Sequence, residues 1–416
     1  MICNAMKLAL VASALFALSA CGRKETPAPP AAPVENAADA APAATAAPPV
    51  VASGSAPAAA SATPEPAARC SILDCNDACP CAGHDTCVEK RCVRDPKWKI
   101  AEIVAGGDAF ACASYADGHV WCAGNNVTGQ LGRGTDLAND PTLSKNELRG
   151  PGRVDAVRAP TQLAAGESHA CALWPAGVSC WGLGGNGELG WGIFRGDPSP
   201  QMVRDLPDAT SIVARGHHTC AIKKSGAVVC WGANRMGQLG DGTTEGRAAP
   251  VAVVGITAAK QLALGTQRSC ALLRDGSVSC WGGSAEGSPP HVVAGLPHVD
   301  EIAATAVATC ARSGGTVRCW GPDFGDRPAV VKSITEAAHI AAGRDIVCAL
   351  RTNGEVFCTS GQGEQAYYVT NDSEKKHLQA RLMVVSEGYA CSVRKDERLD
   401  CDVDLRPALK AVIEQL

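Results

Sequence analysis

The sequence predicts an all-β fold: a seven-bladed β-propeller with one cross-strand disulfide per blade, preceded by a small disulfide-rich module. Short apolar runs alternate with Gly, Asp and Asn turns, and helical periodicity is scarce. A stretch with two cysteines, 9 or 10 residues apart, recurs seven times, and a repeat of roughly 40–50 residues is the length of a propeller blade. The seven pairs are Cys112 with Cys122, Cys171 with Cys180, Cys220 with Cys230, Cys270 with Cys280, Cys310 with Cys319, Cys348 with Cys358, and Cys391 with Cys401.

The two cysteines of a pair are expected to face each other across an antiparallel hairpin. Pairing Cys220 with Cys230 leaves the loop Lys224-Ser225-Gly226, whose last residue should be left-handed. Directly opposed residues have Cα atoms about 4.5–5.5 Å apart, which a disulfide tolerates. Metal binding is the alternative, but two thiolates without His or Cys partners make a poor zinc site. We therefore predict disulfides, with no metal and no cofactor.

Each repeat is expected to supply four strands, so that seven repeats fill residues 97–416. In the third repeat a first strand at 209–216 precedes the cysteine hairpin, and a fourth strand at 250–255 follows a turn-rich connection. The other first strands are expected at 99–107, 160–166, 258–265, 300–306, 336–343 and 380–388. Further fourth strands are expected from Pro290, from Pro328, at Tyr367-Tyr368 and, closing the seventh repeat, at 407–416.

Residues 1–20 are typical of a signal peptide, because Lys7 precedes an apolar run of small and aliphatic residues. The run ends in Leu18-Ser19-Ala20-Cys21, which resembles the lipobox of bacterial lipoproteins. The resemblance implies that Cys21 becomes the lipid-bearing amino terminus and holds the protein at the cell envelope, at the outer membrane or cell surface. A plain secretory signal with a chance cysteine is the alternative.

The cysteine count agrees with export. If Cys3 leaves with the signal and Cys21 carries lipid, 22 − 2 = 20 cysteines remain. Complete disulfide pairing in an oxidising compartment requires an even number.

A spacer and a small module precede the repeats. Residues 21–69 consist mainly of Ala, Pro, Val, Ser and Thr, a composition typical of an extended or disordered linker. Residues 70–96 have too few apolar residues for a core, so that disulfides would have to hold them. Their six cysteines allow fifteen connectivities, and a zinc site around His84 is the alternative. The six are Cys70, Cys75, Cys79, Cys81, Cys87 and Cys92.

Three motifs recur in the best-preserved repeats: a His-x-Cys-Ala strand, Gly-x-Val-x-Cys-Trp-Gly, and Asn-x-x-Gly-Gln-Leu-Gly. Together they resemble the regulator of chromosome condensation family, whose repeats build seven-bladed propellers. The best matches are 168–192, 218–242 and 111–134, whereas later repeats lose the Gly-Gln-Leu-Gly segment. The resemblance covers about residues 98–416 and implies the fold. It does not imply one activity, because the family includes a nucleotide-exchange factor, an ultraviolet receptor and a secreted inhibitor of β-lactamases.

No catalytic constellation is apparent, and we expect a protein that is not an enzyme. A net charge of −4 gives no basic footprint for nucleic acid. The long connection of the second repeat carries Trp191, Ile193 and Phe194, the composition of a partner-binding surface; the alternative is that these side chains fold back over their own blade. His169 and His218 are interpreted as structural.

These observations predict a monomeric, membrane-anchored propeller that binds a protein, or less favourably a glycan, outside the cytoplasm. An envelope enzyme acting on polysaccharide and a purely structural surface lipoprotein are the alternative hypotheses.

Overall fold

A computed structural model of the chain describes residues 85–88, 91–94, 99–107, 109–136, 148–360, 366–368, 380–385, 390–395 and 399–401. The chain divides into two units, Met1–Ala67 and Ala68–Leu416, and every described residue belongs to the second. The predicted signal peptide, the lipidation at Cys21 and the linker therefore lie outside the described residues. Of the cysteine module, the structure describes the backbone of one hairpin, β1 (Asp85–Val88) and β2 (Arg91–Arg94), in which Cys87 is opposite Cys92. The other four cysteines of the module, Cys70, Cys75, Cys79 and Cys81, lie outside the described residues.

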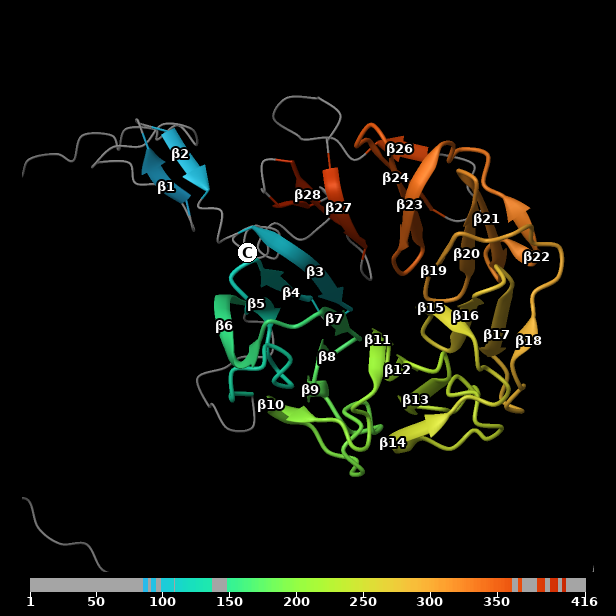
Figure 1. The fold of residues 1–416 in the computed structure, drawn as a ribbon, viewed down its shortest axis with the longest axis horizontal. Helices are drawn as coiled ribbons and strands as arrows, with labels where there is room; N and C mark the ends of the chain where they lie inside the picture. The colour runs from blue at the N-terminus through green and yellow to red at the C-terminus, as the bar shows by residue number, and fades with distance from the viewer. Residues whose placement is uncertain are drawn as a thin grey trace, which may run out of the picture. The chain divides into compact units, whose positions relative to one another are not determined.

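Seven further sheets follow one another along the chain, and we number them blades 1 to 7 (Figure 1). Blade 1 contains β3 (Ile100–Gly106), β4 (Phe110–Tyr115), β5 (His119–Asn125) and β6 (Leu148–Arg158). Blade 2 contains β7 (Gln162–Ala165), β8 (His169–Trp174), β9 (Gly177–Gly182) and β10 (Asp197–Met202). Blade 3 contains β11 (Ala209–Arg215), β12 (His218–Lys223), β13 (Val228–Gly232) and β14 (Arg247–Ala252). Blade 4 contains β15 (Ala259–Leu264), β16 (Arg268–Leu273), β17 (Val278–Gly282) and β18 (His291–Val292).

The remaining blades keep the same order. Blade 5 contains β19 (Glu301–Ala304), β20 (Thr309–Ser313), β21 (Thr316–Gly321) and β22 (Gly325–Val330). Blade 6 contains β23 (Ala337–Ala342), β24 (Ile346–Arg351), β25 (Val356–Ser360) and β26 (Ala366–Tyr368). Blade 7 contains β27 (Ala380–Val385), β28 (Ala390–Arg394) and β29 (Leu399–Cys401).

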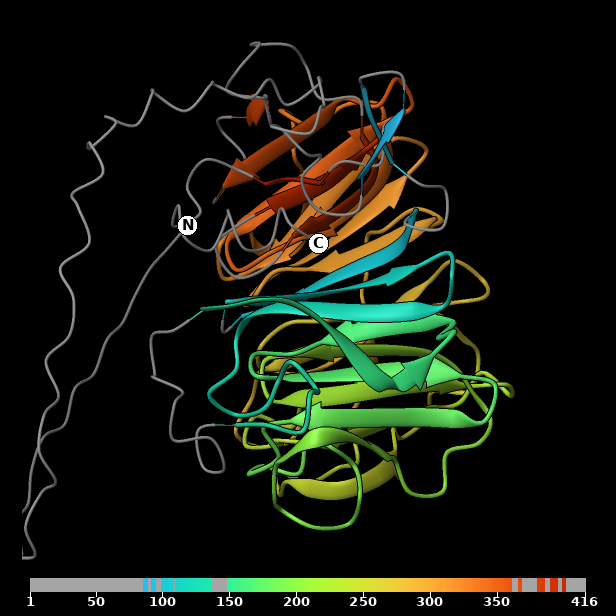
Figure 2. The ribbon, with the colours of Figure 1, turned by 90° about the vertical axis from the view of Figure 1, so that its left-hand side faces the viewer.

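The strands of each blade form an antiparallel meander, and the first strands of successive blades contact one another. Figure 2 shows the sheets from the side. The ring closes because β27 contacts β3, and Arg381 donates a hydrogen bond to the carbonyl of Ile100. The prediction of an all-β, seven-bladed propeller is confirmed. The expected fourth strand of blade 7, at 407–416, lies outside the described residues.

In blades 1 to 6 the two cysteines of each hairpin are joined by a disulfide between the second and third strands, with the predicted pairing. In blade 7, Cys391 is disulfide-bonded and lies opposite Cys401. The bridges of blades 1 to 6 join Cys112 to Cys122, Cys171 to Cys180, Cys220 to Cys230, Cys270 to Cys280, Cys310 to Cys319, and Cys348 to Cys358.

The hairpin register agrees with the turn arithmetic, but the strands lie closer together than expected. Cys220 is opposite Cys230, and Gly226 at the end of the loop has a φ of 88°. Across the six bridges of blades 1 to 6 the paired Cα atoms are 4.0–4.1 Å apart, which corrects the expected 4.5–5.5 Å. The short Cα distance follows from the hydrogen-bonding pattern of the hairpin. The amide of Lys223 donates to the carbonyl of Ala227, and hydrogen-bonded pairs alternate with non-hydrogen-bonded ones along the strands. Cys220 and Cys230 therefore form a non-hydrogen-bonded pair, in which the strands approach most closely.

Two fourth strands begin earlier than predicted. We expected Pro250 and Pro328 to open them, yet β14 begins at Arg247 and β22 at Gly325. A register shift between Cys230 and Gly232 admits the extra residues, so that Arg247 pairs with Gly232. Proline is tolerated there because each fourth strand is an edge strand. Tyr367 and Tyr368 lie in β26, as predicted.

The core consists of seven apolar clusters among the described residues, and each combines side chains from two adjacent blades. The cluster between blades 3 and 4, for example, joins Cys230 and Leu239 to Leu262 and Trp281. Because blades are joined by apolar packing on both faces of their middle strands, both parities of those strands are apolar. The blades are thus joined at seven junctions of the same kind. The residues that fill a junction differ from one pair of blades to the next.

Candidate functional site

One edge of the ring carries two kinds of connection, and we call it the loop face. In an antiparallel meander the connection from first to second strand and that from third to fourth strand emerge at the same edge. Backbone hydrogen bonds join the first-to-second connections of adjacent blades: the amide of Glu167 donates to Gly216 (2.8 Å) and that of Thr266 to Ala306 (2.8 Å). The loop face is therefore a continuous surface around the central channel, built from many blades.

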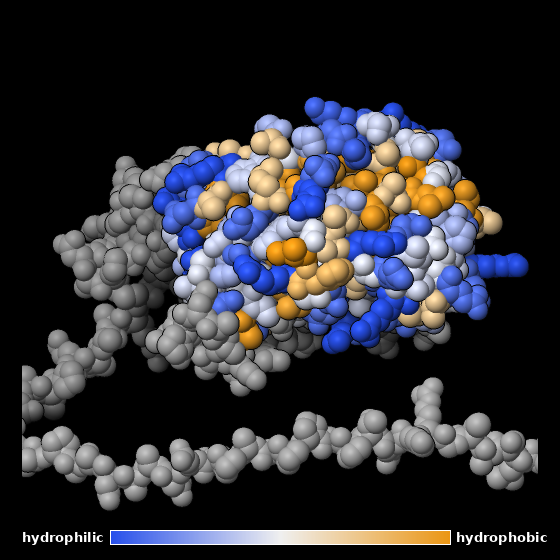
Figure 3. All heavy atoms as spheres, turned by 90° about the horizontal axis from the view of Figure 1, so that it is seen from below, coloured by the Kyte–Doolittle hydropathy of each residue, from blue (hydrophilic) through white to orange (hydrophobic). Residues whose placement is uncertain are grey.

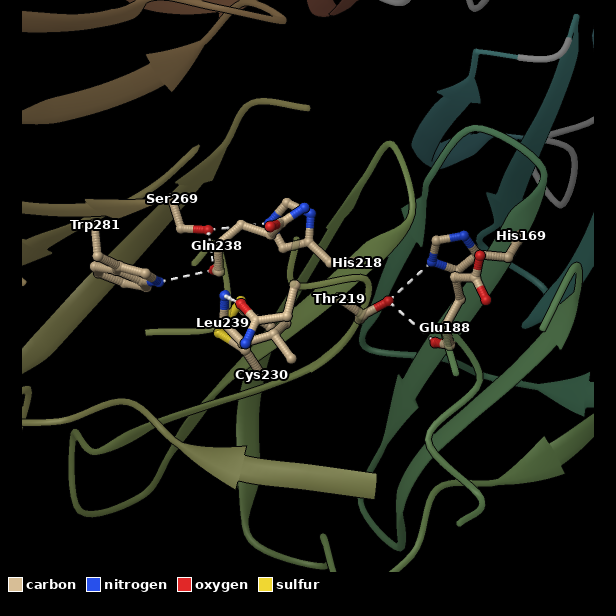
Figure 4. Close-up of a disulfide and its surroundings, with 11 residues drawn as sticks. His169, Glu188, His218, Thr219, Cys230, Gln238, Leu239, Ser269 and Trp281 are labelled. Atoms are coloured by element: carbon tan, nitrogen blue, oxygen red, sulfur yellow. Dashed lines mark hydrogen bonds between the residues drawn. A yellow bond between two sulfur atoms is a disulfide. The ribbon is translucent and has the colours of Figure 1, made fainter. Parts of the chain in front are cut away.

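A segment of the third-to-fourth connection fills the junction with the next blade in repeats 1 to 3. The indole N–H of Trp181, Trp231 and Trp281 donates to the carbonyl of Gln130, Glu188 and Gln238 on the preceding blade, at 3.0, 2.7 and 2.9 Å. Figure 4 shows the last of these bonds beside the disulfide of Cys230. The leucine that follows each acceptor residue is fully buried at the same junction. We call this segment, Gly-(Gln/Glu)-Leu-Gly, the junction segment: 129–132, 187–190 and 237–240.

The two buried histidines belong to the same joints. His169 Nε2 lies 2.9 Å from Thr219 Oγ1, and His218 Nε2 lies 3.0 Å from Ser269 Oγ, each across a blade boundary (Figure 4). Burial lowers the pKa of His169 to about 4 and that of His218 to about 3, so both imidazoles are neutral at pH 7. A fully buried neutral imidazole that bonds a hydroxyl has no access to a substrate, so these histidines act in the structure.

The structure separates the three residues of the predicted binding loop. Trp191 is half-buried and packs against the core between blades 2 and 3, whereas Ile193 and Phe194 expose 49% and 58% of their surface. The loop is anchored to blade 3, because the amide of Gly192 donates to the carbonyl of Ala248 at 2.6 Å. One side chain thus folds back over its blade, and the next two face solvent.

Large exposed apolar side chains are otherwise scattered over the described part of the chain. The side of the ring drawn in Figure 3 carries apolar side chains in separate groups among hydrophilic ones. The exposed large apolar residues are Ile193, Phe194, Met202, Val254, Val292, Val307 and Val330. Ile193 and Phe194 are the two that are adjacent in sequence, which distinguishes them as a candidate contact.

A cavity of about 500 Å³, with both charged and apolar residues in its lining, lies at the mouth of the channel on the loop face. Its lining includes Glu167 of blade 2, Arg268 of blade 4 and Arg344 of blade 6, so it spans the channel. The guanidinium of Arg215 also crosses the channel and lies 3.5 Å from the carbonyl oxygen of Ala342. Arg268 and Arg344 outnumber Glu167 in the lining, so the cavity carries one excess positive charge, which suits a carboxylate or another anion.

A buried carboxylate borders this mouth. His217 lies 3.0 Å from Glu167 and 3.3 Å from the fully buried side chain of Glu188. Burial alone would raise the pKa of Glu188, but hydrogen bonds from His217 and Asn186 outweigh it and hold that pKa below its ordinary value. Glu188 is therefore ionised and fixes the position of His217.

A set of side-chain hydrogen bonds, which we call clips, joins the first strands of adjacent blades and was not predicted from the sequence. One carboxylate or amide oxygen in each of four first strands accepts the amide of a residue on the next blade, so the clips tie adjacent blades together. The pairs are Glu102 with Leu163 (2.6 Å), Gln162 with Ile212 (2.9 Å), Gln261 with Ile302 (2.9 Å) and Glu301 with Ile340 (3.2 Å). The signal available in the sequence was a Glu or Gln before an aliphatic residue, at one position of an otherwise apolar strand.

Family comparisons agree with the junction geometry. The regulator of chromosome condensation repeat matches residues 117–173 and 225–272, and a second model of that repeat matches 100–130, 210–238 and 259–288. This chain carries regulator of chromosome condensation repeats. The matched ranges include the hairpins and junction segments of blades 1 and 3, and the recognition made from the motifs is confirmed.

Individual relatives give the same fold. The chain is 33% identical over 130 residues to the mitochondrial RCC1 domain-containing protein RUG3 of Arabidopsis thaliana, which is 30% of this chain and about a quarter (27%) of the relative's length. Human WBSCR16 is similar in structure, with a TM-score of 0.61 at 18% identity over 73% of this chain and 89% of that one. Prp20p of Saccharomyces cerevisiae, studied for its binding to Gsp1p and histones, has a TM-score of 0.57 at 19% identity over 75% and 84%.

The described residues contain no group of three or more His, Cys, Asp or Glu placed to hold a metal ion. No helix in this part of the chain is long and apolar enough to cross a membrane.

Proposed function

We propose that this chain is a non-enzymatic propeller that binds a protein partner through its loop face, and that a lipid on Cys21 holds it at the bacterial cell envelope. The exposed pair Ile193 and Phe194 carries the binding part of this proposal. Because Trp191 packs into the core and Gly192 is bonded to blade 3, the pair is presented from an anchored base. Apolar side chains held in this way lose little conformational freedom when a partner covers them.

Related propellers support a protein as the partner. Repeats of this family typically build binding or exchange-factor proteins rather than classical enzymes, and Prp20p was studied for its binding to Gsp1p and histones. The cavity at the channel mouth lies on the same face, and its arginines would meet an anionic group of the partner.

Capture by the full-length chain tests the binding part. Immobilised protein is incubated with an envelope extract, and the retained proteins are identified by mass spectrometry. The double variant Ile193→Ser/Phe194→Ser should lose the specific partner. Val330→Ser, which removes an equally exposed apolar side chain (48%) from blade 5, should retain it. Equal capture by the wild type and the double variant would show that this loop is not the contact.

The anchor is tested separately. The residues Leu18-Ser19-Ala20-Cys21 support acylation of the cysteine thiol. Cells expressing the chain are fed labelled palmitate and fractionated. The wild type should be labelled and sediment with membranes, whereas Cys21→Ser should be unlabelled and released. Label retained by Cys21→Ser would refute a lipid at this residue.

A further inference from the structure

The junction between blades 4 and 5 differs from the three before it, because repeat 4 has no Gly-(Gln/Glu)-Leu-Gly segment. The connection from β17 to β18 is short, and its sequence is Gly-Ser-Ala-Glu-Gly-Ser-Pro-Pro over residues 283–290. The apolar cluster of this junction accordingly has no side chain from that connection, whereas the preceding junction includes Leu239. Between blades 5 and 6, where the connection is shorter still, Phe324 packs against the junction cluster.

A cavity of about 380 Å³ occupies the space that the missing segment would fill. Its lining contains Cys280, Trp281, Gly282, Val293, Trp320 and Gly321. The strand registers make these the counterparts of Cys230, Trp231, Gly232, Val253, Trp281 and Gly282 one junction earlier.

Several of those earlier residues hold the junction segment. Leu239 packs in one cluster with Cys230, Val253 and Trp281, and the backbone of Gln238 lies beside Gly282. The cavity therefore corresponds to the space that the junction segment occupies between blades 3 and 4.

The indole of Trp320 is available for a hydrogen bond. Its counterpart Trp281 donates to the carbonyl of Gln238 at 2.9 Å. In the described part of the chain no acceptor is bonded to the Trp320 N–H, and its ring lines the cavity. A backbone carbonyl placed as that of Gln238 is placed would satisfy this donor.

The charge of the junction has also changed. Arg268 occupies the strand position held by the buried neutral imidazoles of His169 and His218 in blades 2 and 3. Arg268 is only partly buried and lines both this cavity and the larger cavity at the channel mouth. With Arg327 and Asp326 also in the lining, the cavity carries one excess positive charge, which suits an acidic occupant.

We propose that this cavity is a docking site for an extended peptide segment of a partner protein, in which an acidic residue is followed by leucine and glycine. The peptide would take the place that Glu188-Leu189-Gly190 holds between blades 2 and 3. Its leucine packs on Trp320 and Val293, the carbonyl of its acidic residue accepts the N–H of Trp320, and its carboxylate faces Arg268. The proposal rests on the proposed function only in taking a protein as the partner, and the site is separate from Ile193 and Phe194.

The probe is a fluorescein-labelled synthetic peptide with the sequence Asn-Gly-Glu-Leu-Gly-Trp-Gly, and the measurement is its anisotropy on titration with the full-length protein. Saturable binding is expected, and a peptide with Ser in place of Leu should bind at least tenfold more weakly. Trp320→Phe, which keeps a smaller aromatic ring and removes the N–H, should weaken binding about three- to tenfold.

Arg268→Gln should weaken binding of this peptide and leave unchanged the binding of a peptide with Gln in place of Glu. Arg235→Gln, at an exposed arginine of blade 3, is the matched control and should have no effect.

Three results would overturn the proposal: no saturable binding, equal binding of the Leu and Ser peptides, or equal effects of Arg268→Gln and Arg235→Gln. Ile193→Ser/Phe194→Ser should bind the peptide as the wild type does, so failure of this site and failure of the loop contact are distinguishable. A thermal melt of each variant confirms that it is folded.

Discussion

Gly240→Ala should reveal how tightly the junction segment is held. Gly240 has a φ of 66°, and a Cβ at this position would lie 2.7 Å from Trp281 Cδ1 and 2.8 Å from its Nε1. A left-handed conformation costs an alanine roughly 1–2 kcal/mol. Overpacking adds about 1–3 kcal/mol, and loss of the Trp281–Gln238 hydrogen bond about 0.5–1.5 kcal/mol. We therefore expect the free energy of unfolding to fall by about 2.5–6.5 kcal/mol.

The same loop supplies a matched control. Gly242 has a φ of 81° and nothing within 4 Å of the position that its Cβ would take. Gly242→Ala should thus incur only the backbone term, about 1–2 kcal/mol. Urea unfolding followed by tryptophan fluorescence measures both variants. If both lose the same stability, the contact with Trp281 does not hold the junction, and the reasoning is wrong.

Two further predictions concern charge and covalent structure. Burial raises the pKa of Glu102 to about 7 from 4.5, so its contribution to stability is greatest below about pH 4.5 and is lost as pH rises toward 7; this loss is at most roughly 3 kcal/mol. The variant Glu102→Gln should not show this loss of stability, which urea midpoints measured at pH 4 and pH 8 would reveal. If stability changes with pH in the same way in the wild type and the variant, Glu102 is not the group responsible. Removing one bridge with Cys220→Ala/Cys230→Ala should cost about 2–3 kcal/mol, because the cross-link closes a loop of about ten residues in the unfolded chain. An unchanged urea midpoint under oxidising conditions would count against that value.

Sequence was most informative where one local rule decides the geometry. The hairpin of Cys220 and Cys230 follows from the two-residue period of a strand and from the left-handed conformation of Gly226. Both features can be predicted from the amino-acid sequence. The early start of β14 at Arg247 could not be predicted, because a register shift on an edge strand leaves no compositional trace.

The candidate sites depended on information the sequence does not contain. Trp191, Ile193 and Phe194 have similar composition, and only the packing of the loop on blade 3 separates the half-buried ring from the two exposed side chains. The cavity between blades 4 and 5 arises from a missing segment. Loss of that segment alone does not predict a cavity, since Phe324 compensates for a similar loss one blade later.

The cysteine pairing has a consequence for how the chain matures. The six bridges of blades 1 to 6 each join a cysteine to the next one along the chain, 9 or 10 residues away. A polypeptide that enters an oxidising compartment amino end first would therefore present each thiol and its correct partner in immediate succession. Vectorial oxidation alone would yield these native pairs, and repair by an isomerase would be unnecessary in this region. None of the six bridges crosses a blade boundary, so blades 1 to 6 are covalently closed hairpins that non-covalent contacts and the continuous chain join to one another.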